Sequence, residues 1–316
     1  IRMATGHGKL CITWENFEGE DILICYAIYA LNSSEKPIMG TLPLSSKLLR
    51  SRNLIACPKG FLSVCLEKRN ASNILAFHTI TPSGTLLSCT YQHLDYSPTS
   101  SLCVVATGAG ALIYGLANHE PKVRVDFIGY DGKIKNFAFQ APNAQKLIGH
   151  QSPIATRISG SMFEITHKGL RKDILGSHGF PGIKASAESR KDILAYAWIE
   201  PDTMNLWGCI NNESPRLLSR ELTIRSVQTG FSKTNPWAVI LVINPDFSTF
   251  LVASSIDAHY QIPLTGDQSE LDILVEEFHC LSTKNGLYIS LSDQDGRFYV
   301  FHIAEHTAEL VIKSKE

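Results

Sequence analysis

QHLDYSPTSSLCVVATGAGALIYGLANHEPKVRVDFI, residues 92–128, is the stretch that decides the fold expected for this chain. Runs of apolar or alternating residues, separated by turns rich in glycine, asparagine and proline, predict short β-strands. The predicted strands are His93–Pro98, Leu102–Ala106, Ala111–Leu116 and Val123–Ile128. Four such strands within about 40 residues are typical of one antiparallel sheet that packs on further copies of itself.

Similar segments recur along the whole chain at intervals of roughly 40 to 45 residues. The recurring third strands read ILICYAI, ILAFHTI, ALIYGLA, MFEITHK, NLWGCIN, TFLVASS and RFYVFHI. A single sheet cannot cover both of its faces, so each must stack on its neighbours. We therefore expect an all-β fold: a single-domain, seven-bladed β-propeller of four-stranded antiparallel blades over residues 1–316, with six or eight blades as alternatives.

The strands of each blade are designated A to D, from the innermost outward. With residues 92–128 as blade 3, Ile134–Phe139 is predicted to be strand A of blade 4. Arg2–His7 either supplies strand A of blade 1 or joins the last blade. In such a fold the B–C turns lie on one face and the A–B turns on the other.

Two junctions resemble those of WD-repeat propellers. Tyr96-Ser97-Pro98 followed by LCVVATG resembles the A–B junction of that family, and Asp295-Gly296 followed by RFYVFHI resembles its B–C junction. No Trp-Asp dipeptide closes a C strand, so the family's hydrogen-bonded network is carried over to no residue here. The resemblance implies an interaction platform within a larger assembly. We therefore expect a protein-binding scaffold and not an enzyme.

Composition gives weaker indications. The formal net charge of −1 indicates no general attraction to nucleic acid or membranes, and no apolar run is long enough to span a bilayer. The eight cysteines fall in predicted strands without a C-x-x-C pair, which favours buried free thiols and an intracellular, cytoplasmic or nuclear location. Three sequons, at Asn32, Asn70 and Asn212, keep a secreted carbohydrate-active propeller as an alternative.

Motifs for catalysis or metal binding are not recognised. The eleven histidines show no ligand spacing, and no G-x-S-x-G nucleophile elbow occurs. Glu276 and Glu277 are the best candidates for one carboxylate of a glycosidase pair, but no acid on a predicted inner strand other than Asp95 could be the second. We expect no metal, no cofactor and no catalytic residue.

Acidic residues concentrate in the predicted B–C turns of blades 5, 6, 7 and 1, whereas KRNASN, GAG and SGS occupy blades 2 to 4. This acidic arc predicts a docking face for a basic peptide or a Lys/Arg-rich protein surface. The alternative is turn chemistry, because Asp side chains hydrogen-bond the local backbone. The predicted partner-binding residues are Glu18, Glu20, Asp21, Glu200, Asp202, Asp246, Asp267, Glu270, Asp293 and Asp295.

A basic patch is predicted on the opposite face. Residues 121–191 contain twelve Lys or Arg and five Asp or Glu. Such a patch favours contact with nucleic acid or an acidic partner within a complex, or is ordinary solubilising charge. Its members are Lys146, Lys168, Arg171, Lys172, Arg190 and Lys191.

Overall fold

The computed structural model describes residues 1–18, 21–31, 35–44, 48–117, 122–130, 133–140, 144–148, 153–157, 162–165, 171–173, 185–190, 193–200, 203–211, 213–220, 224–232, 235–255, 258–266, 269, 271–293, 295–304 and 307–313.

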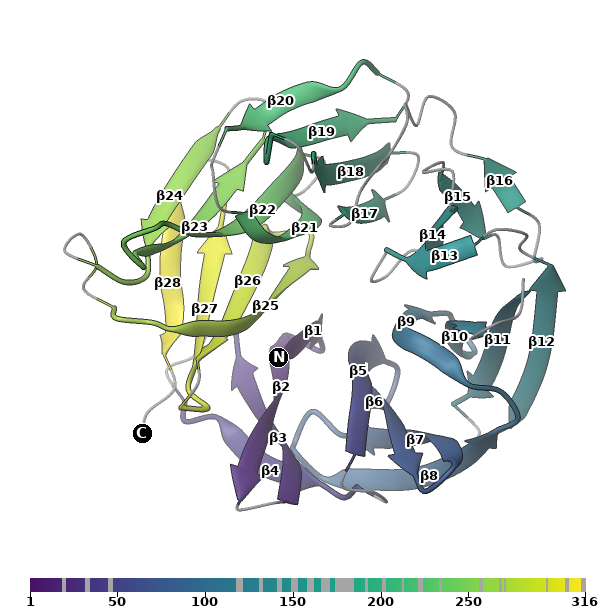
Figure 1. The fold of residues 1–316 in the computed structure, drawn as a ribbon. Coiled ribbons are helices and arrows are strands. Elements are labelled where there is room, and N and C mark those ends of the chain that lie inside the picture. Colours follow the sequence, from purple (N-terminus) through teal and green to yellow (C-terminus); the bar gives the residue numbers. More distant parts are fainter. Residues whose placement is uncertain are drawn as a thin grey trace. The chain divides into compact units, whose positions relative to one another are not determined.

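These residues form seven four-stranded antiparallel sheets, and each sheet is built from four strands that follow one another in the chain (Figure 1). Sheet 1 comprises β1 (Arg2–Gly6), β2 (Lys9–Glu18), β3 (Asp21–Ala30) and β4 (Ile38–Leu42). Sheet 2 comprises β5 (Leu48–Cys57), β6 (Gly60–Arg69), β7 (Ser72–Ile80) and β8 (Leu86–Leu94). Sheet 3 comprises β9 (Pro98–Ala106), β10 (Gly110–Ala117), β11 (Lys122–Gly129) and β12 (Ile134–Gln140). Sheet 4 comprises β13 (Ala144–Leu147), β14 (Ile154–Arg157), β15 (Met162–Ile165) and β16 (Arg171–Asp173).

Sheet 5 comprises β17 (Ala185–Arg190), β18 (Ile193–Ile199), β19 (Leu206–Ile210) and β20 (Arg216–Ser219). Sheet 6 comprises β21 (Ile224–Ser232), β22 (Asn235–Ile243), β23 (Thr249–Ser254) and β24 (His259–Pro263). Sheet 7 comprises β25 (Val275–Ser282), β26 (Leu287–Asp293), β27 (Phe298–Ile303) and β28 (Ala308–Lys313). The expected seven sheets are therefore confirmed. β1 pairs with β2 in the first sheet, which decides between the two alternatives for the N-terminal strand.

The chain divides into two compact units, one of Ile1–Pro153 with Ile165–Arg171 and one of Ile154–Glu164 with Lys172–Glu316. In the first unit the A strands β1, β5 and β9 lie side by side. One apolar core joins sheets 1 and 2 around Phe61, Cys65 and Ile24. A second joins sheets 2 and 3 around Phe77 and Ile113.

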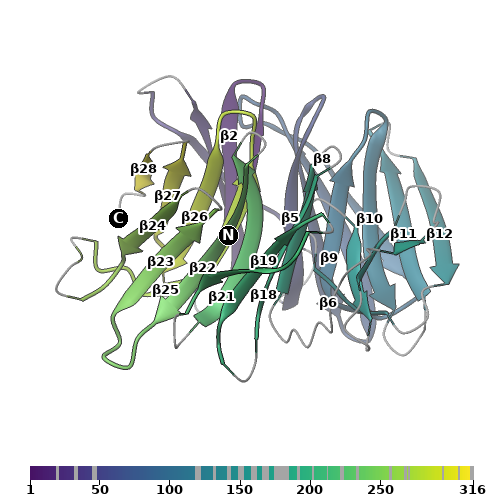
Figure 2. The same ribbon diagram turned by 90° about the horizontal axis from the view of Figure 1, so that it is seen from above.

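The second unit repeats this arrangement. Its A strands β17, β21 and β25 are neighbours, and Figure 2 shows β21, β22 and β23 running alongside one another. Ile240 and Val252 lie in the core between sheets 5 and 6. Leu241, Leu251 and Ile289 lie in the core between sheets 6 and 7. Because successive residues of a strand point to opposite faces, one strand such as β22 contributes to both cores.

The predicted strand assignment is wrong by one strand in blade 3. His93 and Leu94 end β8, the outer strand of sheet 2, and pair with Ile74 and Asn73. Ala111–Leu116 lies in strand B rather than C, and Ile134–Phe139 lies in β12, strand D of sheet 3, rather than in strand A of blade 4. Tyr96–Pro98 consequently stands at the D–A connection between sheets 2 and 3, not at an A–B junction.

The reason lies in how similar these segments are in pattern. A half-polar strand before an apolar strand fits an A strand as well as a D strand, because only pairing partners distinguish the two. Strand A of sheet 4 is the short β13, whose sequence AQKL carries almost no β pattern. Gly110 begins β10 after the β9–β10 turn, and an added Cβ at this position would collide with the Ile128 carbonyl oxygen of β11.

All eight cysteines are free, and seven of them are buried or partly buried; Cys89 is exposed. Within the described residues, no helix has the length and apolar character needed to cross a membrane.

Candidate functional site

The turns of sheets 5 to 7 lie at two opposite edges of these sheets. Ser232 and Thr283, at the ends of β21 and β25, form a parallel bridge, and Arg190 at the end of β17 donates to the Thr283 carbonyl oxygen (2.8 Å). The A–B turns therefore meet at one edge. Since the strands are antiparallel, the B–C turns lie at the other edge, as expected.

In two of these B–C turns, the described acids accept hydrogen bonds from residues of the same turn or of the strand that follows it. Glu200 Oε2 accepts hydrogen bonds from the Thr203 hydroxyl and from Trp207 Nε1 (3.2 Å). Asp246 Oδ1 accepts from the Ser248 backbone N–H (2.9 Å) and hydroxyl (2.6 Å). These bonds lower the pKa of both carboxyl groups, so each is a negative charge at neutral pH.

The turn of sheet 7 divides its two acids. Asp293 is 5% exposed, and its Oδ1 accepts from the backbone N–H groups of Asp295 (3.0 Å) and Arg297 (2.8 Å) while Oδ2 accepts from the Tyr299 hydroxyl (3.3 Å). Asp295 is largely exposed and pairs with Arg297 (3.8 Å). Asp293 is thus an internal turn residue, and Asp295 is the acid that a partner can reach.

The remaining acids of the predicted arc are only partly described. Glu18 and Asp21 are partners in the backbone register of the β2–β3 hairpin, at the B–C turn of sheet 1. Glu20, Asp202, Asp267 and Glu270 lie outside the described residues. The corrected strand assignment also changes blade 3, because GAG is its A–B turn and not its B–C turn. The sequence between β10 and β11 contains Glu120, so blade 3 does not lack an acid between its B and C strands, as the assignment of GAG to that position had implied.

An exposed aromatic residue stands beside one of these acids. Phe247, next to Asp246, is 81% exposed and has a φ of 67°, a left-handed conformation that is rare for a bulky residue. Its backbone is held firmly: its N–H donates to the Asn244 carbonyl (2.9 Å), and its own carbonyl accepts from the Thr265 hydroxyl (3.3 Å). In sheet 1, Phe17 is likewise 60% exposed beside Glu18. The sequence analysis missed both phenylalanines because it considered only charge.

The predicted basic patch is described at few positions. Arg190 is half-buried and engaged by the Thr283 carbonyl. Lys146 lies in β13, and Arg171 and Lys172 lie in β16. Lys168 and Lys191 lie outside the described residues. The patch stays a prediction.

A buried polar cluster lies between sheets 2 and 3. Asp126 of β11 is 4% exposed; it accepts hydrogen bonds from Tyr96 Oη and from Gln92 Nε2 of β8 (3.3 Å each). Asn136 of β12, with its amide turned so that both of its atoms find partners, also donates to Asp126 (3.2 Å). The Arg124 guanidinium lies 5.5 Å from the centre of the Tyr96 ring.

Burial raises the pKa of Asp126 above its ordinary value of 3.8, and the hydrogen bonds from Tyr96 and Gln92 oppose that shift. Burial also raises the pKa of Tyr96. The sequence predicts a half-exposed outer strand around Asp126, and this pattern gives no indication of a buried polar cluster. One feature of the sequence could have indicated the cluster: Asp126 is an acid inside an otherwise alternating apolar strand. This feature points to a buried acid only once β11 is recognised as a C strand, which has neighbours on both sides.

Next to this cluster, the gap between sheets 2 and 3 contains a hollow of about 390 Å³. Leu62 and Phe77 of sheet 2 and Ile128 of sheet 3 line it, together with the hydroxyl-bearing Thr79, Ser88 and Thr90. The strand register explains why the hollow adjoins the polar cluster. Ile128 and Asp126 project from the same side of β11, as Thr90 and Gln92 do from β8. The volume lies within the range of small-molecule sites, about 300–1,000 Å³.

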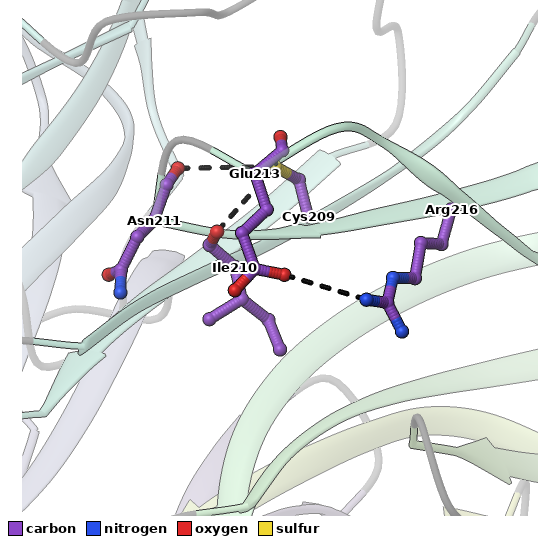
Figure 3. Close-up of polar contacts among 5 residues, drawn as sticks. All are labelled: Cys209, Ile210, Asn211, Glu213 and Arg216. Atoms are coloured by element: carbon purple, nitrogen blue, oxygen red, sulfur yellow. Dashed lines mark hydrogen bonds and ion pairs between the residues drawn. The ribbon is translucent and has the colours of Figure 1, made fainter.

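The gap between sheets 5 and 6 holds a far smaller hollow, of about 40 Å³. Small residues such as Ala197, Gly208 and Ala238 line it, and a Glu213–Arg216 ion pair (3.8 Å) borders it. Figure 3 shows that pair beside Cys209, whose thiol donates to the Glu213 carbonyl oxygen (2.9 Å). Burial raises the pKa of Cys209, so the thiol is protonated and unreactive at neutral pH.

Within the described residues, no group of three or more His, Cys, Asp or Glu is arranged to hold a metal ion.

Comparison with known proteins places the fold. The chain matches no family model and no curated protein. Among solved structures, it resembles one from a study of two prolyl endopeptidases, with a TM-score of 0.57 and 10% identity over 98% of this chain and 49% of that one. It also resembles the β-propeller domain of the trilobed protease from Pyrococcus furiosus, with a TM-score of 0.53 and 8% identity over 98% of this chain and 96% of that one. The fold is a β-propeller.

These similarities correct one expectation. The prediction that the chain is not an enzyme is wrong as an inference from its architecture, because proteins named as a prolyl endopeptidase and a protease contain the same β-propeller. At about 10% identity the likeness shows the fold alone and assigns no activity.

Proposed function

We propose that this β-propeller is a protein-interaction platform that binds a basic peptide or a Lys/Arg-rich protein surface through its B–C turns. The observation that carries the proposal is Phe247: an 81% exposed aromatic side chain, beside Asp246, on a backbone held in a left-handed conformation. Exposed aromatic residues are enriched at the centres of protein interfaces, where they supply much of the binding free energy.

The backbone of Phe247 adopts a conformation that is unfavourable for phenylalanine. A left-handed φ costs a non-glycine residue about 1–3 kcal/mol, and Asn or Gly would occupy the same position at lower cost. The hydrogen bonds with Asn244 and Thr265 hold the backbone of the turn, so the point from which the side chain projects is fixed. A turn whose backbone is already ordered loses little backbone entropy when it binds a partner.

Charge supports the basic character of the partner. Glu200 and Asp246 remain ionised at neutral pH, and Asp295 is largely exposed at the same edge of sheets 5 to 7. A negative surface speeds the encounter with a positive partner, and Lys or Arg can stack on an exposed phenylalanine ring. An interaction platform is also what the WD-repeat-like junction at Asp295-Gly296 implies, and eight free cysteines support a reducing, intracellular setting.

The variant Phe247→Asn tests the proposal. We expect it to raise the free energy of unfolding by about 1 kcal/mol, because Asn tolerates the left-handed conformation. It should weaken binding of a fluorescein-labelled, Lys/Arg-rich decapeptide about tenfold in anisotropy titrations at low ionic strength. Asp246→Asn should mainly slow association. The matched control is Met39→Ser on β4, a 62% exposed apolar residue away from any B–C turn. Equal binding by Phe247→Asn and the parent would contradict the proposal, and an unchanged association rate for Asp246→Asn would leave the acids with a role in their turns alone.

A further inference from the structure

The hollow between sheets 2 and 3 has the composition of a ligand site rather than of a packing defect. Phe77, Leu62 and Ile128 provide an apolar floor, and the wall formed by β7 and β8 carries three hydroxyl groups. In the register of these strands, Thr79 pairs with Ser88 and Phe77 with Thr90. Directly opposed residues share a face, so all four side chains face the gap.

The three hydroxyl groups are available. Thr79, Ser88 and Thr90 make no side-chain hydrogen bond to any residue that the structure describes, and none of them is fully buried. Half-enclosed hydroxyl groups without protein partners can bond a ligand without first giving up an internal bond. This arrangement differs from the Asp126 cluster one register step away, where the polar side chains bond one another.

A single positive charge stands at the hollow. Lys59, in the A–B turn of sheet 2, is exposed, and its Nζ reaches across to the Tyr130 carbonyl oxygen of sheet 3 (3.3 Å). None of the described residues that line the hollow carries a carboxylate. Cys57, also in the lining, has its pKa raised by burial and adds no charge at neutral pH. The electrostatic complement of this site is therefore an anion.

We propose that the hollow binds a small organic anion with an apolar, aromatic or aliphatic body. The body packs on Phe77, Leu62 and Ile128, and hydroxyl or carbonyl groups of the ligand bond Thr79, Ser88 and Thr90. Its carboxylate, sulfonate or phosphate group pairs with Lys59 at the mouth. An apolar pocket with a few convergent polar groups and one charge is the usual composition of such sites. This site is separate from the B–C turns and does not depend on them.

Two dyes of nearly equal shape test the proposal: 8-anilinonaphthalene-1-sulfonate, which is an anion, and N-phenyl-1-naphthylamine, which is uncharged. Fluorescence titration of the parent protein should show one saturable site for each dye. Lys59→Gln should raise the dissociation constant of the sulfonate about fivefold and leave that of the uncharged dye within about twofold. The matched control Lys284→Gln removes an exposed lysine from the A–B turn of sheet 7 and should change neither.

A second variant tests the location. Thr90→Phe fills the hollow and should abolish saturable binding of both dyes, with near-UV circular dichroism and thermal unfolding confirming that the variant folds. The Lys59→Gln comparison stands even if Thr90→Phe does not fold, because Lys59 is exposed. The proposal is overturned if the parent binds neither dye saturably, if Lys59→Gln and Lys284→Gln behave alike, or if a folded Thr90→Phe binds both dyes as the parent does.

Discussion

Asp126 and Asp293 are two buried aspartates in comparable surroundings, at 4% and 5% exposure, and each accepts a hydrogen bond from a tyrosine hydroxyl at 3.3 Å. They differ in where their other hydrogen bonds come from. Asp293 is held by two backbone N–H groups from the next four residues of its own turn. Asp126 is held by side chains of β8, β12 and the connection between sheets 2 and 3.

The comparison separates local from tertiary causes of a buried charge. The backbone donors to Asp293 are in place as soon as its turn forms, so the hydrogen bonds that satisfy this carboxylate are local to the β26–β27 hairpin. Gln92 reaches Asp126 only when sheet 3 packs on sheet 2, and Tyr96 comes from the connection between these two sheets. Asn136, in contrast, is paired with Asp126 within sheet 3. The hydrogen bonds to Asp126 are 3.2 to 3.3 Å long and come from side chains, and burial outweighs them, so its pKa rises.

The largest expected effect concerns Asp293. Asp293→Ala removes the acceptor of two backbone N–H groups and one tyrosine hydroxyl, and we expect it to lower the free energy of unfolding by about 2–3 kcal/mol. Urea denaturation followed by circular dichroism measures the change. Asp295→Ala, two residues away and exposed, is the control and should change stability by less than about 0.5 kcal/mol. A loss below about 1 kcal/mol for Asp293→Ala would contradict its role in the turn.

A smaller effect is expected from the tyrosines. Tyr96→Phe removes one of the few donors to Asp126, whereas Tyr299→Phe leaves Asp293 both of its backbone donors. We expect losses of about 1–2 kcal/mol for Tyr96→Phe and about 0.5 kcal/mol for Tyr299→Phe at neutral pH. Equal losses would mean that the two aspartates are equally well satisfied, and the distinction between them would fail.

The smallest effect is a pH dependence. Because the pKa of Asp126 is raised on folding, its contribution to stability is complete below its unfolded pKa, near 3.8, and is lost as pH rises through the folded value. Asp126→Asn keeps the shape and lacks the titration. The melting temperature of this variant relative to the parent should therefore increase by a few degrees between acid and neutral pH and then level off. A difference that is constant with pH, measured by calorimetry, would contradict the raised pKa.

The repeat and the number of sheets were predictable from sequence because they depend on local rules. Strands separated by glycine- and asparagine-containing turns at intervals of about 40 residues indicate four-stranded units, and strands such as Phe298–Ile303 are where the pattern places them. The error in blade 3 arose where the pattern is symmetrical, since β8 and β9 are each compatible with an inner or an outer strand. The short β13 offered no signal that would have corrected it.

The candidate sites follow the same division. Asp246, Asp293 and Asp295 are predictable as turn residues, because their neighbours in sequence are also their neighbours in space. That Asp293 is buried while Asp295 is exposed depends on Tyr299 of the following strand. The exposure of Phe247 depends on the bond that its N–H donates to Asn244 and the bond that its carbonyl accepts from Thr265, which together hold its turn. From sequence alone, an apolar residue in a turn would be expected to be covered by another strand or loop.

From the sequence alone this protein could be assigned to the all-β class, with seven four-stranded units (six or eight as alternatives) and with acids in several B–C turns, because hydrophobic alternation and turn chemistry act over a few residues. Only the tertiary structure decided which strand pairs with which around residues 92–140, and with it the polar cluster at Asp126 and the hollow beside Phe77. Gln92 and Asp126 are 34 residues apart, and Lys59 and Tyr130 are 71 apart. Contacts at such separations form when one sheet packs on the next, and no local pattern specifies them.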